Sequence, residues 1–311
     1  MIIVRDTMKN SSKKVRIAVM GHGNVGKGVI DAIDVSPDTE LTGIITRRVK
    51  ELSKELPNKN VVSDVKDLND VDVVVLAIPS ELVPRTAPEI LKLGINTIDS
   101  FDMHKDNLWK LRQKLNKIGK EHNSVAMIGF GWDPGINSMM RAIFEATIPF
   151  GVTDTDFGPG MSMGHSAVVR SITGVKDGIS ITKPKGGGRH LREVYVILEP
   201  GANFEEVKKK IVNYPFYFEH DETYVTQVDS LDNYKDMGHG GLVTRRGKCG
   251  KTSNQFLQYK IRVDNPKATG QIMIAAARAS MKLKPGAYTP IDVPLSYFLV
   301  GSDEELIKKF I

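Results

Sequence analysis

Residues 15–26 read VRIAVMGHGNVG, an apolar strand pattern that runs directly into a glycine-rich turn. The glycines are spaced as G-x-G-x-x-G, which is a weak signal alone because any flexible turn can show it. Here the motif follows a predicted strand at 15–20 and opens a predicted helix that runs to about Ile33. In that setting the first glycine permits a tight turn, the second admits a pyrophosphate, and the third lets helix and strand pack closely. The stretch therefore predicts a dinucleotide-binding fold.

The first 130 residues alternate short β-branched runs with helical patterns, which is typical of βαβ units and a parallel sheet. Beyond the first strand and helix, we predict strands at 41–46, 71–78, 96–98 and 124–128, and helices at 84–93 and about 107–122. The run VDVVVLAI at 71–78 is almost continuously apolar, as expected of a strand covered on both faces. We predict the α/β class, with a doubly wound parallel Rossmann sheet over residues 1–130.

After residue 150 the strand patterns alternate with period two and few helices separate them. In Phe256–Val263 the apolar residues share one face and the polar residues share the other, which indicates a half-buried antiparallel strand. Similar strands are predicted at 193–198, 224–228 and 241–245, and helices at 204–212 and 271–283. We predict a second, α+β domain over 131–283, built on an open, mostly antiparallel sheet. The segment 284–311, with a helical pattern at its end, could return to the first domain.

Composition narrows the class of protein. The 311 residues are 41% hydrophobic and 26% charged, which is typical of a soluble globular protein. The net charge of +6 is too mild to indicate a nucleic-acid partner. The single cysteine, Cys249, excludes an internal disulfide, and no side-chain cluster has metal-ligand spacing. No signal peptide or membrane span is evident, because the longest apolar stretch, Val73–Pro79, is far shorter than the ~20 residues required. We expect a cytoplasmic protein without metal, membrane or nucleic acid.

The end of the second predicted strand selects the dinucleotide. NAD-binding folds place a carboxylate there to bind the ribose 2′-hydroxyl, whereas this chain has Thr46, Arg47 and Arg48. Arginine binds phosphate through a bidentate fork, so we predict NADP, with a solvated basic loop as the alternative. The segment Ala77–Ser80 either lines the nicotinamide half or forms a plain turn. The residues predicted to bind the cofactor are Gly21, His22, Gly23, Asn24, Val25, Gly26, Thr46, Arg47, Arg48, Ala77, Ile78, Pro79, Ser80, Ser100, Phe101, Asp102, Phe130, Gly131, Trp132, Asp133 and Pro134.

Two carboxylates follow predicted strands, at the sheet edge where ligands of open α/β folds bind. Asp102 follows the strand at 96–98, and Asp133 lies in the glycine-rich loop before Gly135. Either could bind a substrate ammonium or accept a proton, although Asp133 before a proline could also form a turn. For Asp99 we favour a cap or turn role. Trp132 supplies an apolar wall or packs at the domain junction.

The second domain offers an anion site. Residues 157–166 read FGPGMSMGHS and are predicted to be neither helix nor strand, so that backbone N–H groups can approach a ligand carboxylate. Arg192 has the parity of Val194 and Val196, which places a charge on an apolar face. A buried guanidinium needs an anionic partner, and a substrate carboxylate would supply one. Alternatively, Arg192 opens its strand and reaches water. His239 is a ligand or a turn residue.

Together these motifs resemble one enzyme family, the meso-diaminopimelate dehydrogenases. The resemblance rests on GHGNVG at 21–26, TRR at 46–48, FDMH at 101–104, GWDPG at 131–135, GPGMSMGHS at 158–166, GHGG at 238–241 and DNP at 264–266. These occur in the family's order along nearly the whole chain. The resemblance implies a homodimer with a Rossmann domain and a substrate-binding and dimerisation domain. It implies reversible NADP-dependent oxidative deamination at the D-centre of meso-2,6-diaminopimelate, giving L-2-amino-6-oxopimelate and ammonia, within the lysine and diaminopimelate pathway.

The resemblance also implies roles for individual residues. Asp102, Asp133 and Trp132 would serve catalysis. The residues that would contact the substrate are Asp102, Asp133, Phe157, Met163, Gly164, Thr182, Arg192, His239 and Asn265. By this resemblance, Phe157 and Met163 stand where better-known members carry Trp and Gln. The segment before Arg192 is also shorter than in those members. These departures predict a looser pocket, as in the subgroup that accepts other D-amino acids.

Two other functions fit the same cofactor motif. Another NADP-dependent reductase of this fold, of the dihydrodipicolinate reductase or homoserine dehydrogenase type, would show no dependence on ammonia. A non-catalytic NADP(H)-sensing module would bind NADPH and a protein partner without turning over any substrate.

Overall fold

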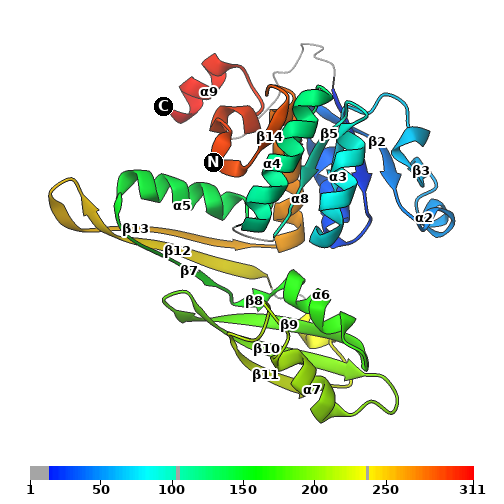
Figure 1. The fold of residues 1–311 in the computed structure, drawn as a ribbon, viewed down its shortest axis with the longest axis vertical. Coiled ribbons are helices and arrows are strands. Elements are labelled where there is room, and N and C mark those ends of the chain that lie inside the picture. The colour runs from blue at the N-terminus through cyan, green and yellow to red at the C-terminus, as the bar shows by residue number, and fades with distance from the viewer. Residues whose placement is uncertain (1–13, 103–105, 236–237) are drawn as a thin grey trace. The chain divides into compact units, whose positions relative to one another are not determined.

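The computed structural model describes residues 14–102, 106–235 and 238–311, and these form two compact units (Figure 1). Unit 1 contains the described residues up to Ser138 together with Pro266–Ile311, and unit 2 is Met139–Asn265. The predicted end of the second domain at residue 283 is wrong, because the helix that follows Pro266 belongs to unit 1. Which unit binds cofactor and which binds substrate stays a prediction.

Unit 1 is built on a seven-stranded, fully parallel sheet in the order β14-β6-β5-β4-β1-β2-β3. The strands are β1 Val15–Met20, β2 Thr39–Ile45, β3 Val61–Val62, β4 Val73–Leu76, β5 Asn96–Asp99, β6 Val125–Met127 and β14 Gly286–Tyr288. The order of β1 to β6 is that of a doubly wound dinucleotide-binding sheet, and it reverses between β1 and β4. The predicted Rossmann sheet is confirmed, with β3 and β14 added.

Helices cover both faces of this sheet (Figure 1). The helices of unit 1 are α1 Asn24–Val35, α2 Val49–Glu55, α3 Val83–Leu91, α4 Asp106–Glu121, α8 Asn265–Ser280 and α9 Asp303–Phe310. Leu91 of α3 and Leu115 of α4 are buried in one apolar cluster with Leu76 of β4. On the other face α1 and α8 touch, because a Cβ on Gly28 would lie 2.5 Å from the carbonyl oxygen of Pro266. The contact between α1 and α8 explains why α8 groups with unit 1.

The end of the chain is tied into unit 1 by Arg278, a buried residue near the end of α8. Its Nη2 donates to Asp38 Oδ1 at 2.7 Å, and its Nη1 donates to the carbonyl oxygen of Phe298 at 2.8 Å. Strand β14 then pairs with β6 from Gly286 to Tyr288. The C-terminal segment therefore completes the parallel sheet.

Unit 2 contains two sheets, in the orders β11-β10-β9-β8 and β13-β12-β7. Its strands are β7 Phe150–Phe157, β8 Gly160–Met161, β9 Val175–Gly186, β10 Arg189–Leu198, β11 Glu222–Gln227, β12 His239–Cys249 and β13 Thr252–Val263, and its helices are α5 Ile136–Thr147 (shared with unit 1 at its start), α6 Met163–Ser171 and α7 Phe204–Val212. Every strand pair is antiparallel except β10 with β11. The predicted α+β class is confirmed, with two sheets in place of one.

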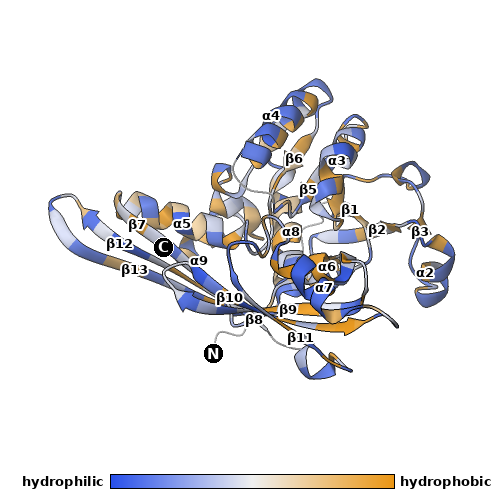
Figure 2. Cartoon of the chain, turned by 60° about the horizontal axis from the view of Figure 1, so that its bottom comes forward, coloured by the Kyte–Doolittle hydropathy of each residue, from blue (hydrophilic) through white to orange (hydrophobic). Residues whose placement is uncertain are grey.

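The two sheets of unit 2 differ in how many apolar side chains they carry. Val169 of α6 and Ile211 of α7 are buried against Val194 and Val196 of β10. Figure 2 shows hydrophobic colouring along parts of β9 to β11 and largely hydrophilic colouring along β12 and β13. In β13 the residues alternate between exposed and half-buried, as the sequence predicts. Across the described ranges, no helix is both long enough and apolar enough to cross a membrane.

Candidate functional site

The glycine-rich turn lies where the strand order reverses, between β1 and β4. Gly21 has a φ of +102°, and a Cβ there would lie 2.3 Å from the carbonyl oxygen of Ala77. A Cβ on Gly26 would lie 2.2 Å from the carbonyl oxygen of Gly21. Both distances are shorter than any real Cβ contact, so packing within the protein requires these two glycines. The turn after β1 and the residues after β4 therefore form one tightly packed edge.

Gly23 differs from the other two glycines of the motif. A Cβ there would meet no atom within 4 Å, and its φ of −82° suits any residue. It is the N-cap of α1, which has neither a side-chain cap nor an acidic residue in its first turn. An uncapped helix N-terminus with open space beside its backbone fits an anionic group such as a pyrophosphate. These residues therefore fit the dinucleotide that the sequence predicts.

The basic residues after β2 lie near this turn. Arg47 and Arg48 are exposed, and within the described ranges neither guanidinium has an ion-pair partner. The backbone N–H of Arg48 donates to Thr46 Oγ1 at 3.2 Å. Burial lowers the pKa of His22, and the charges of Lys27 and Arg48 lower it further. The effect on His22 places the charge of Arg48 within electrostatic reach of the glycine-rich turn.

The loops after β4 and β5 are joined by a reciprocal pair of hydrogen bonds. Ser80 Oγ donates to Asp102 Oδ1 at 2.8 Å, and the backbone N–H of Asp102 donates to Ser80 Oγ at 3.2 Å. Ser80 opens a short 3-10 turn, Ser80–Leu82, directly after the strand edge. The fold thus brings together a residue predicted to bind cofactor and a residue predicted to serve catalysis.

Asp99, at the end of β5, holds the neighbouring loops in place. It is fully buried, and its Oδ1 accepts the backbone N–H groups of Phe101 and Gly129, each at 3.0 Å. Burial raises the pKa of Asp99 to about 6, although the two N–H bonds act in the opposite direction. The turn role expected of Asp99 is confirmed.

The loop after β6 closes on itself and presents Asp133. The N–H of Gly131 donates to the carbonyl oxygen of Pro134 at 2.9 Å, and a Cβ on Gly135 would lie 1.6 Å from the carbonyl oxygen of Gly131. Trp132 is buried and Asp133 is half-buried. The fully buried Asn137, which the sequence analysis missed, donates from Nδ2 to Asp133 Oδ2 at 3.2 Å. Asn137 therefore orients the carboxylate.

In unit 2 the glycine-rich stretch is more regular than predicted. The expectation that residues 157–166 form neither helix nor strand is wrong, because Phe157 ends β7, Gly160–Met161 form β8, and Met163 and Gly164 begin α6. A Cβ on Gly158 would lie 2.3 Å from the carbonyl oxygen of Thr182, and one on Gly160 would lie 2.2 Å from that of Gly238. The glycines therefore serve backbone packing, which brings β9 close to the start of β12.

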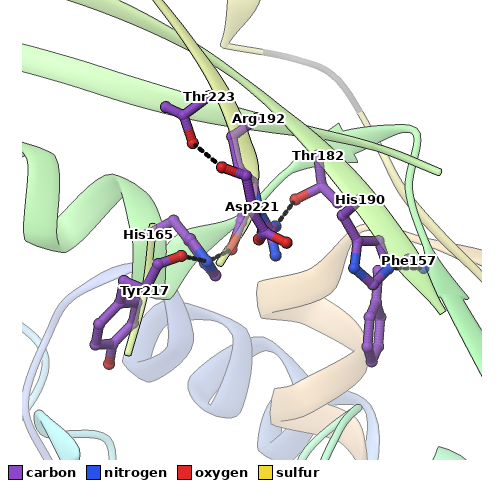
Figure 3. Close-up of polar contacts among 9 residues, drawn as sticks. Phe157, His165, Thr182, His190, Arg192, Tyr217, Asp221 and Thr223 are labelled. Carbon is purple, nitrogen blue, oxygen red and sulfur yellow. Dashed lines mark hydrogen bonds and ion pairs between the residues drawn. The ribbon is translucent and has the colours of Figure 1, made fainter. Parts of the chain in front are cut away.

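Arg192 lies inside β10 and is buried. The apolar face predicted from its parity is confirmed, since Val194 and Val196 are fully buried, and the alternative of a first strand position reaching water is wrong. Its Nε donates to Asp221 Oδ2 at 2.6 Å, and its Nη1 donates to Thr182, which lies directly opposite in the register of β9 and β10. Figure 3 shows this group. The anionic partner predicted for Arg192 is thus supplied by Asp221 of the protein itself.

Three histidines surround this arginine and are held neutral. His165 Nε2 bonds the carbonyl oxygen of Tyr217 at 2.9 Å, so this nitrogen carries the proton and Nδ1 accepts from Ser162 Oγ at 2.8 Å (Figure 3). Burial, with the charge of Arg192 next in size, lowers the pKa of His165 to about 3. Burial and then Arg192 also lower the pKa of His190, and burial lowers that of His239, where Arg192 acts in the same direction. The shared effect of Arg192 places all three rings close to it.

The remaining predicted residues are placed as follows. His239 opens β12 and is buried with its Nδ1 2.9 Å from the carbonyl oxygen of Gly240, so the plain turn role is wrong. The N–H of Phe157 donates to His190 Nε2 at 2.9 Å, and Asn265 opens α8. Within the described ranges, no group of three or more His, Cys, Asp or Glu side chains is arranged to hold a metal ion.

His190 and Asp221 are not among the site residues predicted from the sequence. His190 shares the parity of Arg192 two residues later, and this pattern could have identified it. Asp221 lies in the turn before β11, far from Arg192 in the sequence, and no local pattern marks it.

Comparison with known proteins agrees with this arrangement. Residues 131–188 and 184–265 match the family model of the diaminopimelic acid dehydrogenase C-terminal domain. The chain is 47% identical over 296 residues to meso-diaminopimelate D-dehydrogenase of Bacteroides fragilis, covering 95% of this chain and 98% of that one. It is 33% identical to meso-diaminopimelate D-dehydrogenase of Lysinibacillus sphaericus, with 96% and 99% covered.

Solved structures give the same assignment. The C. glutamicum DAP dehydrogenase in complex with DAP has a TM-score of 0.87 and 29% identity, with 96% of this chain and 100% of that chain covered. An engineered D-amino acid dehydrogenase bound to NADP+ has a TM-score of 0.85 at 29% identity and the same coverage. On its sequence relatives, its domain model and its fold, the chain belongs to the meso-diaminopimelate dehydrogenase family.

Proposed function

We propose that the chain is an NADP-dependent dehydrogenase that oxidatively deaminates the D-centre of meso-2,6-diaminopimelate. The products are L-2-amino-6-oxopimelate, ammonia and NADPH, and the reaction is reversible. The observation that carries the proposal is Arg192, a buried guanidinium whose Nη2 makes no hydrogen bond within the described part of the chain, in a protein that belongs to this family. Such a group binds a carboxylate far more strongly than an exposed arginine does, because water does not compete for its N–H donors.

Unit 1 supplies the residues for the cofactor and the reacting amine. Gly23 and the N-terminus of α1 would hold the pyrophosphate, and Arg47 and Arg48 would hold the 2′-phosphate. When bound, NADP supplies the hydride acceptor. We assign the carboxylates of Asp102 and Asp133 to the reacting amine of the substrate.

The amine must be neutral before hydride can leave the adjacent carbon, because an ammonium has no lone pair to form the new C=N bond. One of the two carboxylates takes that proton, and the other, which stays ionised, stabilises the positive charge of the iminium while water attacks. Ser80 fixes the orientation of Asp102, and Asn137 fixes that of Asp133. Trp132 at the same loop would exclude water from the reacting end.

Absorbance at 340 nm tests the activity. We expect NADP reduction with meso-diaminopimelate and none with the L,L isomer, which lacks a D-centre. In the reverse direction, NADPH oxidation should require ammonia. Keto-acid reduction without ammonia would favour a reductase of the same fold, and NADPH binding without any turnover would favour a sensing module.

We infer that the enzyme also accepts other D-amino acids. The support is the family resemblance, which implies a larger residue, Trp, at the position of Phe157 and a more polar one, Gln, at the position of Met163. Assays with D-alanine, or with pyruvate and ammonia, test this, and the absence of turnover at high enzyme concentration would contradict it.

We further infer a homodimer that acts in the cytoplasm in diaminopimelate and lysine metabolism, as the family resemblance implies. One feature supports an association surface on unit 2. Phe150, Val152 and Phe256 are all more than half exposed, and Val152 and Phe256 flank Arg246 in one row across the three-stranded sheet. Exposed apolar side chains grouped on one sheet face are typical of interfaces.

A further inference from the structure

We propose that Asp221 is a specificity-determining residue that binds the ammonium of the distal amino-acid group, while Arg192 binds the carboxylate of that same group. The inference rests on the proposed function, because it concerns the end of the diaminopimelate molecule that does not react. It assigns to Asp221 a direct contact with substrate, in addition to its contact with Arg192.

The first support is the geometry of the ion pair. Asp221 Oδ2 accepts from Arg192 Nε at 2.6 Å, and the side chains of Arg192 and Asp221 are 9% and 21% exposed. Over the described residues, Asp221 Oδ1 and Arg192 Nη2 have no hydrogen-bond partner. An acceptor and a donor are thus left open on two side chains that touch each other (Figure 3). An α-amino acid carries the complementary pair, an ammonium and a carboxylate joined through one carbon.

The second support is the charge around the pair. Burial and the charge of Arg192 lower the pKa values of His165, His190 and His239, so these rings carry no charge near neutral pH. Asp156, the other carboxylate that acts on His190, accepts the N–H of Gly188 at 2.8 Å. The buried pair therefore contributes one positive and one negative charge at the centre of this group.

A neutral pair selects the ligand by charge. A bare carboxylate bound to Arg192 would leave the open oxygen of Asp221 facing a second anion, which is costly in a poorly hydrated site. A zwitterionic group satisfies both partners at once. Without a carboxylate neighbour, Arg192 would instead favour a substrate whose distal end carries a carboxylate and no ammonium.

Thr223 and the local backbone hold Asp221 in position. The hydroxyl of Thr223 donates to the carbonyl oxygen of Asp221 at 3.1 Å, and the N–H of Asp221 donates to the carbonyl oxygen of Phe218 at 3.1 Å. Thr182 restrains Arg192 independently of Asp221. Removing the charge of Asp221 therefore leaves Arg192 one anchor, which allows the two roles to be separated by experiment.

The test compares two substrates that differ only in the distal amine, meso-2,6-diaminopimelate and D-2-aminopimelate. We measure kcat/KM for both with the wild-type enzyme and with Asp221→Asn, which keeps the shape and an acceptor for Arg192. We expect the variant to lose about 10- to 100-fold on diaminopimelate, as for a lost charge-assisted hydrogen bond. On D-2-aminopimelate the change should stay within about threefold. An equal loss on both substrates would show that Asp221 only orients Arg192, and would overturn the inference.

Two further variants complete the design. Glu222→Gln removes the next charge along the chain, which is exposed and paired with Lys185. This variant should leave kcat/KM unchanged for both substrates. Asp221→Glu keeps the charge and should retain the preference for the substrate with the distal amine; loss of that preference would contradict the inference even if Asp221→Asn does not fold. Failure of the wild-type enzyme to oxidise diaminopimelate would instead reject the proposed function.

Discussion

Arg192 shows at the scale of one residue how a charge can be kept on an apolar strand face. Its neighbours Val194 and Val196 are fully buried, and Asp221 and Thr182 satisfy part of its guanidinium. A buried charge without such partners would cost several kcal/mol. The parity of the strand predicted the burial of Arg192, but it did not predict the partner, because Asp221 comes from a distant turn.

At the same scale, the two arginines after β2 should set the cofactor preference. Replacing Arg47 and Arg48 together with alanine is expected to lower the NADP-to-NAD ratio of kcat/KM by at least about tenfold, because bidentate contacts to a phosphate are removed. Lys54→Ala, which removes an exposed charge from α2, is the matched control. An unchanged ratio in the double variant would refute the assignment of the 2′-phosphate site.

Asp99 should make stability depend on pH. Its folded pKa of about 6 lies above the ordinary value of 3.8, so its contribution is fully present below pH 3.8 and is lost as the pH rises through about 6. Asp99→Asn carries no charge and can still accept the N–H groups of Phe101 and Gly129. As the pH rises from 4 to 7, the unfolding free energy of the variant should increase relative to that of the wild type by up to about 3 kcal/mol.

Denaturant titrations of both proteins at several pH values measure this difference. His165 is present in both, so its opposite trend cancels from the comparison. Parallel stability profiles of wild type and variant would show that the folded carboxyl of Asp99 titrates like that of the unfolded chain.

At the scale of elements, different glycines in the turn between β1 and α1 are expected to serve packing and cofactor binding. Gly23→Ala adds a Cβ into open space at an ordinary φ, so its unfolding free energy should fall by no more than about 1 kcal/mol, the cost of alanine at an N-cap, while NADPH affinity falls at least about tenfold. Gly21→Ala meets the carbonyl oxygen of Ala77 and a φ of +102°, and should cost about 2–4 kcal/mol. Denaturation and fluorescence titration with NADPH distinguish the two effects. Equal NADPH affinity in Gly23→Ala and wild type would place the pyrophosphate elsewhere.

The start of α5 offers a second prediction at this scale. Asn137 is fully buried and its Oδ1 has no hydrogen-bond partner among the residues that the structure describes, so this residue stabilises the core poorly compared with an apolar one. Asn137→Leu should leave stability unchanged or raise it by up to about 1 kcal/mol, while kcat falls about tenfold because Asp133 loses its orienting donor. A full loss of folding, or unchanged kcat, would argue against this role.

Prediction from sequence succeeded where one local pattern decides the structure. The strand β1, the helix α7 and the alternating strand β13 are set by apolar periodicity over adjacent residues. Helix α6 was missed because glycines and the preceding Gly-Pro-Gly mask its pattern, although His165 at its first turn bonds back to its N-cap, Ser162. Asp102, Asp133, Thr182, Arg192 and His239 are predicted as site residues from local motifs and from the family resemblance, whereas the contacts of Asn137 and Asp221 depend on packing that no nearby residue encodes.

At the scale of the whole molecule, assembly can be tested through the exposed face of the three-stranded sheet. Light scattering should give a mass near twice 34.4 kDa for the wild type. Phe256→Glu replaces an exposed apolar side chain with a hydrated carboxylate and should shift the protein towards the monomer, because the interface loses apolar surface that it would bury. Gln227→Glu, at an exposed position of β11 in the other sheet of unit 2, is the control for added charge. A Phe256→Glu protein that stays dimeric would move the interface away from this face.

The split of unit 1 along the chain bears on how the protein is made. Unit 2 is one continuous stretch, Met139–Asn265, whereas unit 1 lacks α8 and β14 until the ribosome has passed Pro266. Domains generally fold as units while the ribosome synthesises the chain from its N-terminus. The later-synthesised unit 2 can therefore finish folding first, while the parallel sheet of unit 1 exposes the unpaired edge of β6 until β14 has been released from the ribosome. A chain that ends at Asn265 and has been released from the ribosome should show unit 2 protected from protease while unit 1 is still cleaved.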